Sequence, residues 1–238
     1  MKTLVVGASG ATGLLVVKQL LAKGEYVKVI IRPSAYLPNS VMQNPRLSTI
    51  RADLLSLSHE QLVEYVKDCH TVVSCLGHTL SFKGVYGHPR RLVTDAVTRL
   101  CAAINRVAPK TPVKFILMNS TGCKNNQLGE KVSLLQNMVL FLLRYLVPPH
   151  ADNEKAAASL PKQSQDYQCI EWVAVRPDSL IDHPHVTQYK TVPSPTRSAL
   201  FDSGKTSRIN VADFMCQLIQ DETCWQQWRG KMPVIYNQ

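Results

Sequence analysis

The sequence is poor in aromatic residues and in charge. Phe, Trp and Tyr make up 7% of its 238 residues, and charged residues make up 18%. Nucleic-acid surfaces combine basic stripes with aromatic side chains, but the densest basic run here is Pro89-Arg90-Arg91. We therefore expect no nucleic-acid partner, and the formal net charge of +10 instead favours anionic ligands such as a phosphorylated cofactor.

Closely spaced cysteines are also lacking. Seven cysteines occur without any Cys-x-x-Cys pair, mostly inside apolar runs. This pattern predicts reduced, buried thiols in a cytoplasmic protein, with neither disulfides nor a metal site. A free active-site thiol stays open at Cys75 or Cys123.

Long hydrophobic runs are missing as well. The most apolar window, residues 134–147, contains polar side chains and is too short to cross a bilayer. A strand is expected already at Lys2–Val6, so we expect no signal peptide and no membrane contact. The window predicts an apolar helix that Pro148-Pro149 ends. This helix is expected in the core or at an interface, with a wall of the substrate pocket or a dimer contact as the more specific alternatives.

The sequence does contain a glycine-rich turn near its start. An apolar run, Leu4 to Val6, precedes the turn Gly7 to Gly13, and a stretch with helical spacing, Leu14 to Leu21, follows it. A strand, a tight glycine turn and a helix N-terminus together form a cradle for a dinucleotide pyrophosphate. The alternative is an ordinary strand-to-helix turn made of small residues.

Each glycine of this turn has a physical role in such a cradle. Gly7 allows the sharp turn, Gly10 lets phosphate approach the backbone, and Gly13 lets the helix pack closely on the strand. The N–H groups of Ala11, Thr12 and Gly13 lie at the helix start, where they can face an anion.

The second expected strand, Tyr26 to Ile31, ends at Arg32. A carboxylate at this place binds the ribose 2′-hydroxyl of NAD, whereas an arginine suits a 2′-phosphate through paired, charge-assisted hydrogen bonds. Arg32, with the hydroxyl of Ser34 close by, therefore predicts NADP(H) in preference to NAD(H). A solvated arginine at a strand end is the alternative.

Strands and helices then alternate along the chain. Further strands are expected at 47–50, 71–76, 113–118, 169–175 and 233–237. This alternation predicts an α/β fold, a Rossmann-type doubly wound parallel sheet with helices on both faces. We expect a single domain over residues 1–238, with an irregular, proline-bearing segment at about 178–208 as a small C-terminal region on the substrate side.

Polar residues follow several of the expected strands. Ligands of doubly wound sheets bind past the carboxyl ends of the strands, where Gly77, His78 and Ser120 stand. His78 either touches substrate or faces water. Lys155 is expected in the first turn of a helix capped by Asp152 or Asn153, where a cation is unfavourable, so a partner such as the cofactor ribose is expected.

Four features lie in order along the chain: the Gly7–Gly13 turn, Arg32, a strand from Trp172 that ends in Arg176-Pro177, and the run from Arg208 to Asp213. Together they resemble the atypical short-chain dehydrogenase/reductase superfamily, in its NmrA-like, NAD(P)H-binding branch. The resemblance implies a Rossmann sheet that binds NADP(H). It implies contacts to the pyrophosphate from Gly7, Ser9, Gly10, Ala11, Thr12 and Gly13, to the 2′-phosphate from Arg32, to adenine from Asp53 and Leu54, to the ribose side from Leu76 and Gly77, and to the nicotinamide end from Ser120, Lys155 and Pro177.

One departure bears on catalysis. Active enzymes of this superfamily often use Tyr-x-x-x-Lys, with tyrosine as the general acid, but Ala151 stands four residues before Lys155. His150, adjacent in sequence, is the first substitute, because histidine exchanges protons near neutral pH. Ser120, Asp152 and Tyr189 are further candidates, and each could equally be structural.

Two functions follow. The first is an oxidoreductase that transfers hydride between NADPH and a small organic acceptor, with Lys155, Ser120 and His150 as catalytic residues. The alternative is a non-catalytic, NmrA-like sensor of NADP that regulates a partner. For both we expect a small-molecule ligand and a monomer or homodimer.

Overall fold

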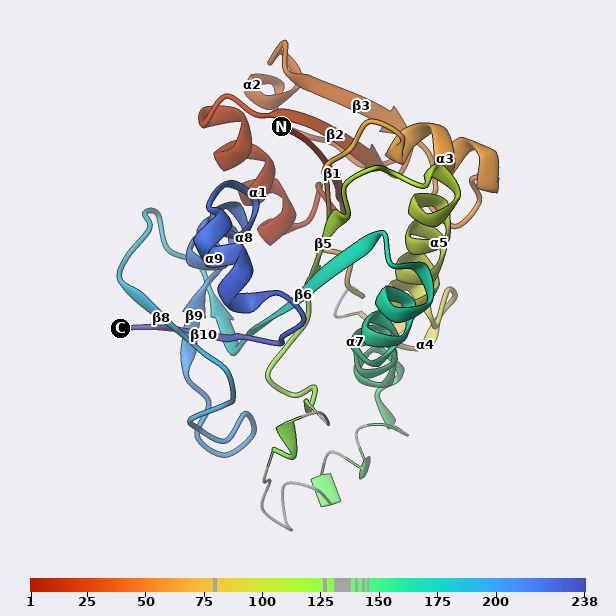
Figure 1. The fold of residues 1–238 in the computed structure, drawn as a ribbon. Helices are drawn as coiled ribbons and strands as arrows, with labels where there is room; N and C mark the ends of the chain where they lie inside the picture. Colours follow the sequence, from red (N-terminus) through yellow and green to blue (C-terminus); the bar gives the residue numbers. More distant parts are fainter. Residues whose placement is uncertain (79–80, 126–127, 131–137, 140, 143, 145) are drawn as a thin grey trace.

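The fold is built on an eight-stranded sheet (Figure 1). The computed structural model describes residues 1–78, 81–125, 128–130, 138–139, 141–142, 144 and 146–238. In sheet order the strands are β3 (Leu47–Arg51), β2 (Tyr26–Ile31), β1 (Lys2–Val6), β4 (Thr71–Ser74), β5 (Val113–Met118), β6 (Ile170–Pro177), β10 (Val234–Asn237) and β8 (Tyr189–Val192). Neighbouring strands are parallel as far as β10, and β8 pairs antiparallel with β10.

Helices cover both faces of this sheet, which confirms the predicted Rossmann-type α/β fold. The helices on one face are α1 (Ala11–Ala22), α8 (Arg208–Gln220) and α9 (Glu222–Trp228). Those on the other face are α3 (His59–Val66), α5 (Leu92–Val107) and α7 (Pro148–Tyr167). Two shorter helices are α2 (Asn39–Met42) and α4 (Phe82–Tyr86). Among the described residues, no helix is long and apolar enough to cross a membrane.

Successive side chains of the central strands point to opposite faces of the sheet, so the core consists of two hydrophobic clusters, one on each face. Leu4 of β1 belongs to the cluster under α3, α5 and α7, together with Leu100, whereas Val5 belongs to the cluster under α1 and α8, together with Phe214. Successive side chains of a strand point to opposite faces, so a strand that is apolar throughout must be covered on both sides.

The segment at 178–208, predicted as irregular, contains three short strands. β7 (Ser179–Ile181) and β9 (Lys205–Ser207) form a small parallel sheet, and β8 extends the large sheet beyond β10. These strands are three or four residues long, and their partners lie far along the chain. Local sequence patterns carry little information about such pairings.

Helix α7 begins earlier than predicted. Pro148 and Pro149 occupy its first turn, where proline loses no hydrogen bond and its φ suits the helix. The expected cap at Asp152 or Asn153 is therefore wrong, and Lys155 lies beyond the first turn, with an exposed side chain. The apolar helix predicted before it, at residues 134–147, falls largely outside the described residues.

Asp152 caps a different helix instead. Its carboxylate accepts the backbone N–H groups of Val93 at 2.8 Å and Thr94 at 3.0 Å, and the Thr94 hydroxyl donates to the Asp152 carbonyl at 3.0 Å. Arg91, the residue at the N-cap of α5, makes no side-chain cap of its own. Asp152 is thus a buried residue of α7 whose carboxylate accepts hydrogen bonds from the backbone N–H groups at the start of α5.

We expect Asp152→Ala to lower the free energy of unfolding by at least about 2 kcal/mol, because two buried N–H groups would lose their acceptor. Urea denaturation followed by circular dichroism measures this change. The matched control is Asp68→Ala, since Asp68 is an exposed aspartate that contacts only Lys2, at 3.5 Å, among the described residues. Equal effects of the two variants would contradict the capping role.

Candidate functional site

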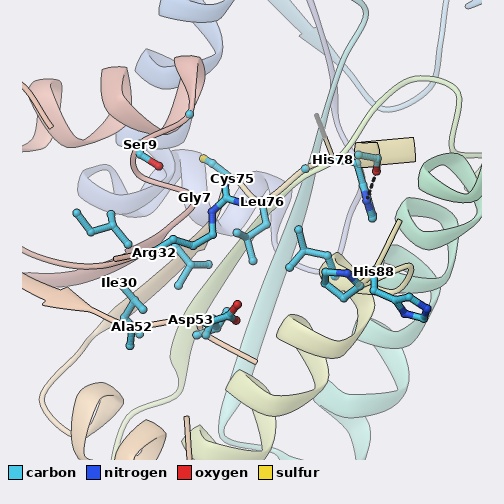
Figure 2. A pocket seen from close by; sticks show the side chains of 18 residues that line it. Gly7, Ser9, Ile30, Arg32, Ala52, Asp53, Cys75, Leu76, His78 and His88 are labelled. Carbon is cyan, nitrogen blue, oxygen red and sulfur yellow. Dashed lines mark hydrogen bonds between the residues drawn. The ribbon is translucent and has the colours of Figure 1, made fainter. Parts of the chain in front are cut away.

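A cleft with a volume of about 360 Å³ lies at the carboxyl edge of the sheet (Figure 2). It sits where the strand order reverses between β1 and β4, the place at which doubly wound sheets bind dinucleotides. The residues that line it are Val6, Gly7, Ser9, Gly10, Ile30, Ile31, Arg32, Ala52, Asp53, Leu54, Cys75, Leu76, Gly77, His78, Gly84, His88, Pro89 and Leu92.

The glycine turn forms the floor of the cleft through very close backbone contacts. Gly7 has a φ of +76°, and a Cβ there would lie 2.5 Å from the carbonyl carbon and oxygen of Cys75. A Cβ on Gly13 would lie 2.2 Å from the Gly7 oxygen. Gly10 stands at the N-cap of α1 without any side-chain cap. The helix start therefore keeps backbone N–H groups available for an anion, as the pyrophosphate of a dinucleotide requires.

Arg32 lies at one end of the cleft. It follows β2, is exposed and lines the cleft together with Ser9 and Asp53, all three of which are labelled in Figure 2. Arg51, at the end of the neighbouring strand β3, donates from Nη1 to the carbonyl of Pro33 at 3.3 Å and to that of Ala35 at 3.0 Å. These contacts hold the loop that carries Arg32. The Arg32 guanidinium, which makes no hydrogen bond or ion pair with another described residue, is thus presented beside the cleft, where a 2′-phosphate could bind.

His78 closes the other end of the cleft. Its ring lies with Nδ1 3.2 Å from the carbonyl oxygen of Gly84, the contact drawn in Figure 2, and with Nε2 2.9 Å from Oδ2 of Asp152. Both ring nitrogens face acceptors, an arrangement that a doubly protonated ring satisfies and a neutral ring satisfies only in part. His78 thus joins the cleft to α4 and α7.

The two cysteines left open as active-site thiols are kept neutral by their surroundings. Burial raises the pKa of Cys75 to about 12, and burial raises that of Cys123 to about 12. Both are therefore thiols at neutral pH, whereas the nucleophilic form is the thiolate.

A second group of polar residues lies where β5 meets α7. Asn119, after β5, donates from Nδ2 to the carbonyl of Asn153 at 3.0 Å, which ties this strand end to the helix. A Cβ built on Gly122 would lie 3.3 Å from Oγ of Ser120, 3.4 Å from Cε1 of His150 and 3.7 Å from its Nδ1. Ser120 and His150 therefore face the same small space, which the missing side chain of Gly122 leaves open.

Glu154 stands one helical turn after His150. Its Oε1 lies 3.6 Å from Nε2 of His150, within reach of an ion pair but too long for a hydrogen bond. Arg144 holds the same carboxylate with two hydrogen bonds, Nε to Oε2 at 2.6 Å and Nη2 to Oε1 at 3.0 Å. Burial opposes ionisation of Glu154, but His150 and Arg144 outweigh it and lower its pKa to about 2.

Comparison with known proteins agrees with this geometry. The sequence profile of the NAD(P)H-binding family matches residues 7–222. The chain belongs to this NAD(P)H-binding family. A search of curated proteins found no match.

Several solved structures have the same fold as this chain although their sequence identity to it is low. A short-chain dehydrogenase/reductase from Veillonella parvula, in complex with NADP, is 14% identical over 99% of this chain and 94% of its own, with a TM-score of 0.72. An oxidoreductase from Lactococcus lactis is 15% identical over 100% of this chain and 91% of its own (TM-score 0.70). An anaerobillin reductase from Escherichia coli is 14% identical over 100% and 97% (TM-score 0.66).

In this member of the NAD(P)H-binding family, the predicted cofactor residues divide into two sets. Those that line the cleft are Gly7, Ser9, Gly10, Arg32, Asp53, Leu54, Leu76 and Gly77. Those that lie outside its lining are Ala11, Thr12, Gly13, Ser34, Ser120, Lys155 and Pro177. Thr12 and Gly13 are buried in the first turn of α1, and Ser34 is exposed.

The structure also shows where three other predicted site residues lie: Pro177, Lys155 and Tyr189. Pro177 ends β6, and its carbonyl accepts the N–H of Thr121 at 3.1 Å. Lys155 makes no hydrogen bond or ion pair within the described part of the chain. The hydroxyl of Tyr189, a candidate proton donor, donates a hydrogen bond to Oδ2 of Asp213 at 2.8 Å. Burial and this hydrogen bond raise the pKa of Tyr189 well above its ordinary value, which makes it a poor proton donor.

Sequence reasoning missed the wall formed by Gly84, His88, Pro89 and Leu92. No periodicity or motif distinguishes this stretch. It reaches the cleft because α5 is anchored by Asp152 and because His78 holds the carbonyl of Gly84. Among the described residues no cluster of His, Cys, Asp or Glu could hold a metal ion.

We expect the stabilising effect of the Glu154 charge to depend on pH. A pKa lowered from 4.5 to about 2 means that the ionised carboxylate favours the folded state, in full above about pH 5, and that this contribution is lost as the pH falls towards 2. The difference in free energy of unfolding between the wild type and Glu154→Gln, measured with urea from neutral to acidic pH, should therefore shrink on acidification. A difference that stays constant over this range would contradict the prediction.

Proposed function

We propose that this chain is an NADPH-dependent oxidoreductase that acts on a small organic acceptor. The observation that carries the proposal is the arrangement of the cleft. One end presents Arg32 for a 2′-phosphate, and the other end is joined through His78 to α7, the helix that holds His150 beside Ser120. A cofactor site and a group able to exchange protons thus lie on connected elements.

The residues fit a bound NADP(H) along the cleft. The glycine turn receives the pyrophosphate, because its close backbone contacts leave no room for side chains. Of the other residues that line the cleft, Asp53 and Leu54 would flank the adenine, and Leu76 and Gly77 would lie on the ribose side. Lys155 and Pro177, which lie outside the cleft lining, would hold the nicotinamide end, with Lys155 on α7 as the residue for its ribose. When bound, NADPH supplies the hydride.

The protein supplies the proton and the orientation of the acceptor. Ala151 has no acidic proton, so the role of general acid passes to His150, with the Ser120 hydroxyl between the ring and the acceptor. His150 is mostly buried, with 13% of its side chain exposed, and it can be reprotonated from solvent. Asp152 is already engaged as the cap of α5 and as the partner of His78.

The second candidate function is a non-catalytic, NmrA-like sensor of NADP. The observation that favours it is Ala151 in place of the tyrosine. For both functions we propose a cytoplasmic protein, a monomer or homodimer, that binds small molecules and neither nucleic acid nor membranes.

We expect Arg32→Ala to lower the affinity for NADPH by about ten-fold or more and to leave that for NADH unchanged, because only the former carries the 2′-phosphate. Isothermal titration calorimetry with both cofactors measures the two affinities. Arg46→Ala is the control, since Arg46 is also an arginine at a strand of this sheet but lies before β3, over the Tyr26 ring. Equal wild-type affinities for the two cofactors would overturn the NADP assignment.

We expect the wild type to oxidise NADPH with at least one acceptor from a panel of quinones, aldehydes and flavins. His150→Ala should then reduce kcat by about 100-fold or more, since positioned general acids contribute that much, while the affinity for NADPH is retained. The loss of nicotinamide absorbance gives the rate. Tight NADPH binding without turnover of any acceptor would favour the sensor, and full turnover by His150→Ala would exclude His150 as the donor.

A further inference from the structure

Three charged or titratable side chains form a chain that leads to Ser120. Arg144 donates two hydrogen bonds to the carboxylate of Glu154. An oxygen of the same carboxylate lies 3.6 Å from Nε2 of His150. On the far side of the ring, Nδ1 and Oγ of Ser120 share the space next to Gly122. The order is Arg144, Glu154, His150, Ser120.

The Glu154 carboxylate, which faces the His150 ring, is held in place by Arg144. Two guanidinium hydrogen bonds restrain the Glu154 carboxylate in the plane of the Arg144 fork, and the lowered pKa keeps it ionised. His150 and Glu154 are four residues apart on α7, so their side chains lie on the same face of the helix. One side of the ring therefore faces an ionised carboxylate, which can accept a hydrogen bond but cannot donate one.

The surroundings of Nε2 determine which ring nitrogen carries the proton. Nε2 of His150 is buried and has no hydrogen-bond partner among the described residues, so its nearest charged neighbour is the Glu154 carboxylate. A bare lone pair on Nε2 would face a negative charge, whereas an N–H there is attracted to it. This favours the proton on Nε2 and leaves Nδ1 directed towards Gly122 and Ser120.

Other groups around the ring do not oppose this assignment. Arg144 is the only other charged residue seen to contact Glu154 in the described part of the chain, and its charge is directed at the carboxylate. Cys123, in the loop after β5, is a neutral thiol because burial raises its pKa to about 12. Ser120 and Cys123, the two described side chains named here on that side of the ring, are therefore both uncharged.

We propose that Glu154 is a positioning residue that holds the proton on Nε2 of His150 and thereby makes Nδ1 the nitrogen that exchanges protons with Ser120. The catalytic consequence rests on the proposed reductase function. In that reaction the imidazolium releases its Nδ1 proton through the Ser120 hydroxyl to the acceptor, which also receives the hydride. The ring keeps its Nε2 proton and regains the other from water.

The experiment measures the tautomer directly, in the full chain without cofactor or acceptor. Nitrogen-15 NMR of the neutral ring, assigned with His150→Ala, distinguishes protonated Nε2 from protonated Nδ1. In the wild type we expect His150 to be predominantly protonated at Nε2. In Glu154→Met, which keeps the side-chain length but removes the acceptor, this preference should fall at least several-fold.

Two further variants separate positioning from folding. Glu154→Gln keeps a carbonyl oxygen that Arg144 directs towards the ring, so it should largely retain the wild-type tautomer. Glu222→Met removes an exposed glutamate that pairs with Lys114 at 2.8 Å and should leave His150 unchanged. If the Met variant at 154 is too unstable to study, Arg144→Lys, which loosens the two-point grip, should weaken the preference instead. A wild-type ring protonated at Nδ1, or a tautomer unaffected by Glu154→Met, would overturn the proposal.

Kinetics distinguish this proposal from the proposed function. Where the wild type turns over, Glu154→Met should lower kcat about ten-fold or more, a part of what a general acid contributes, with an unchanged Kd for NADPH and with rescue in Glu154→Gln. A wild type that never turns over would refute the reductase function, while the NMR result would still decide the role of Glu154.

Discussion

The cofactor cleft depends on the close approach of two stretches of backbone. A Cβ on Gly7 would collide with the carbonyl of Cys75 at 2.5 Å, and a Cβ on Gly13 would lie even closer to the Gly7 oxygen, at 2.2 Å. Glycine is the residue that tolerates both the positive φ and the missing space. Because β1 and β4 are neighbours at the reversal of strand order, this approach opens the cleft at their carboxyl ends and points the start of α1 into it.

A single carboxylate connects the cleft to the second group of polar residues. Asp152 satisfies the first N–H groups of α5 and faces His78, which in turn holds Gly84. The cleft wall and α7 therefore form one hydrogen-bonded unit. The same helix carries His150 and Glu154, so the positions of these two side chains are tied to the wall of the cleft.

Much of this could be predicted from sequence, and the failures have physical causes. The parallel sheet followed from apolar strands that alternate with helices, and the positions of Gly7, Arg32 and Gly77 followed from the ends of those strands. The start of α7 was misjudged because Asp152 resembles a local cap, while its true partners lie about 60 residues away. Arg144 and Glu154 carry no motif, and only the meeting of α7 with the end of β5 places Ser120 next to His150.

The sequence by itself determined the fold class, the family and the place of the glycine turn, because these depend on local periodicity and on glycines at fixed spacing. The tertiary structure decided which polar residues act together. Hydrogen bonds between α5, α7 and the end of β5 bring together side chains that are distant along the chain, and local sequence does not encode their geometry. Ala151 marks the absent tyrosine, but only the folded chain shows that His150 stands between Glu154 and Ser120.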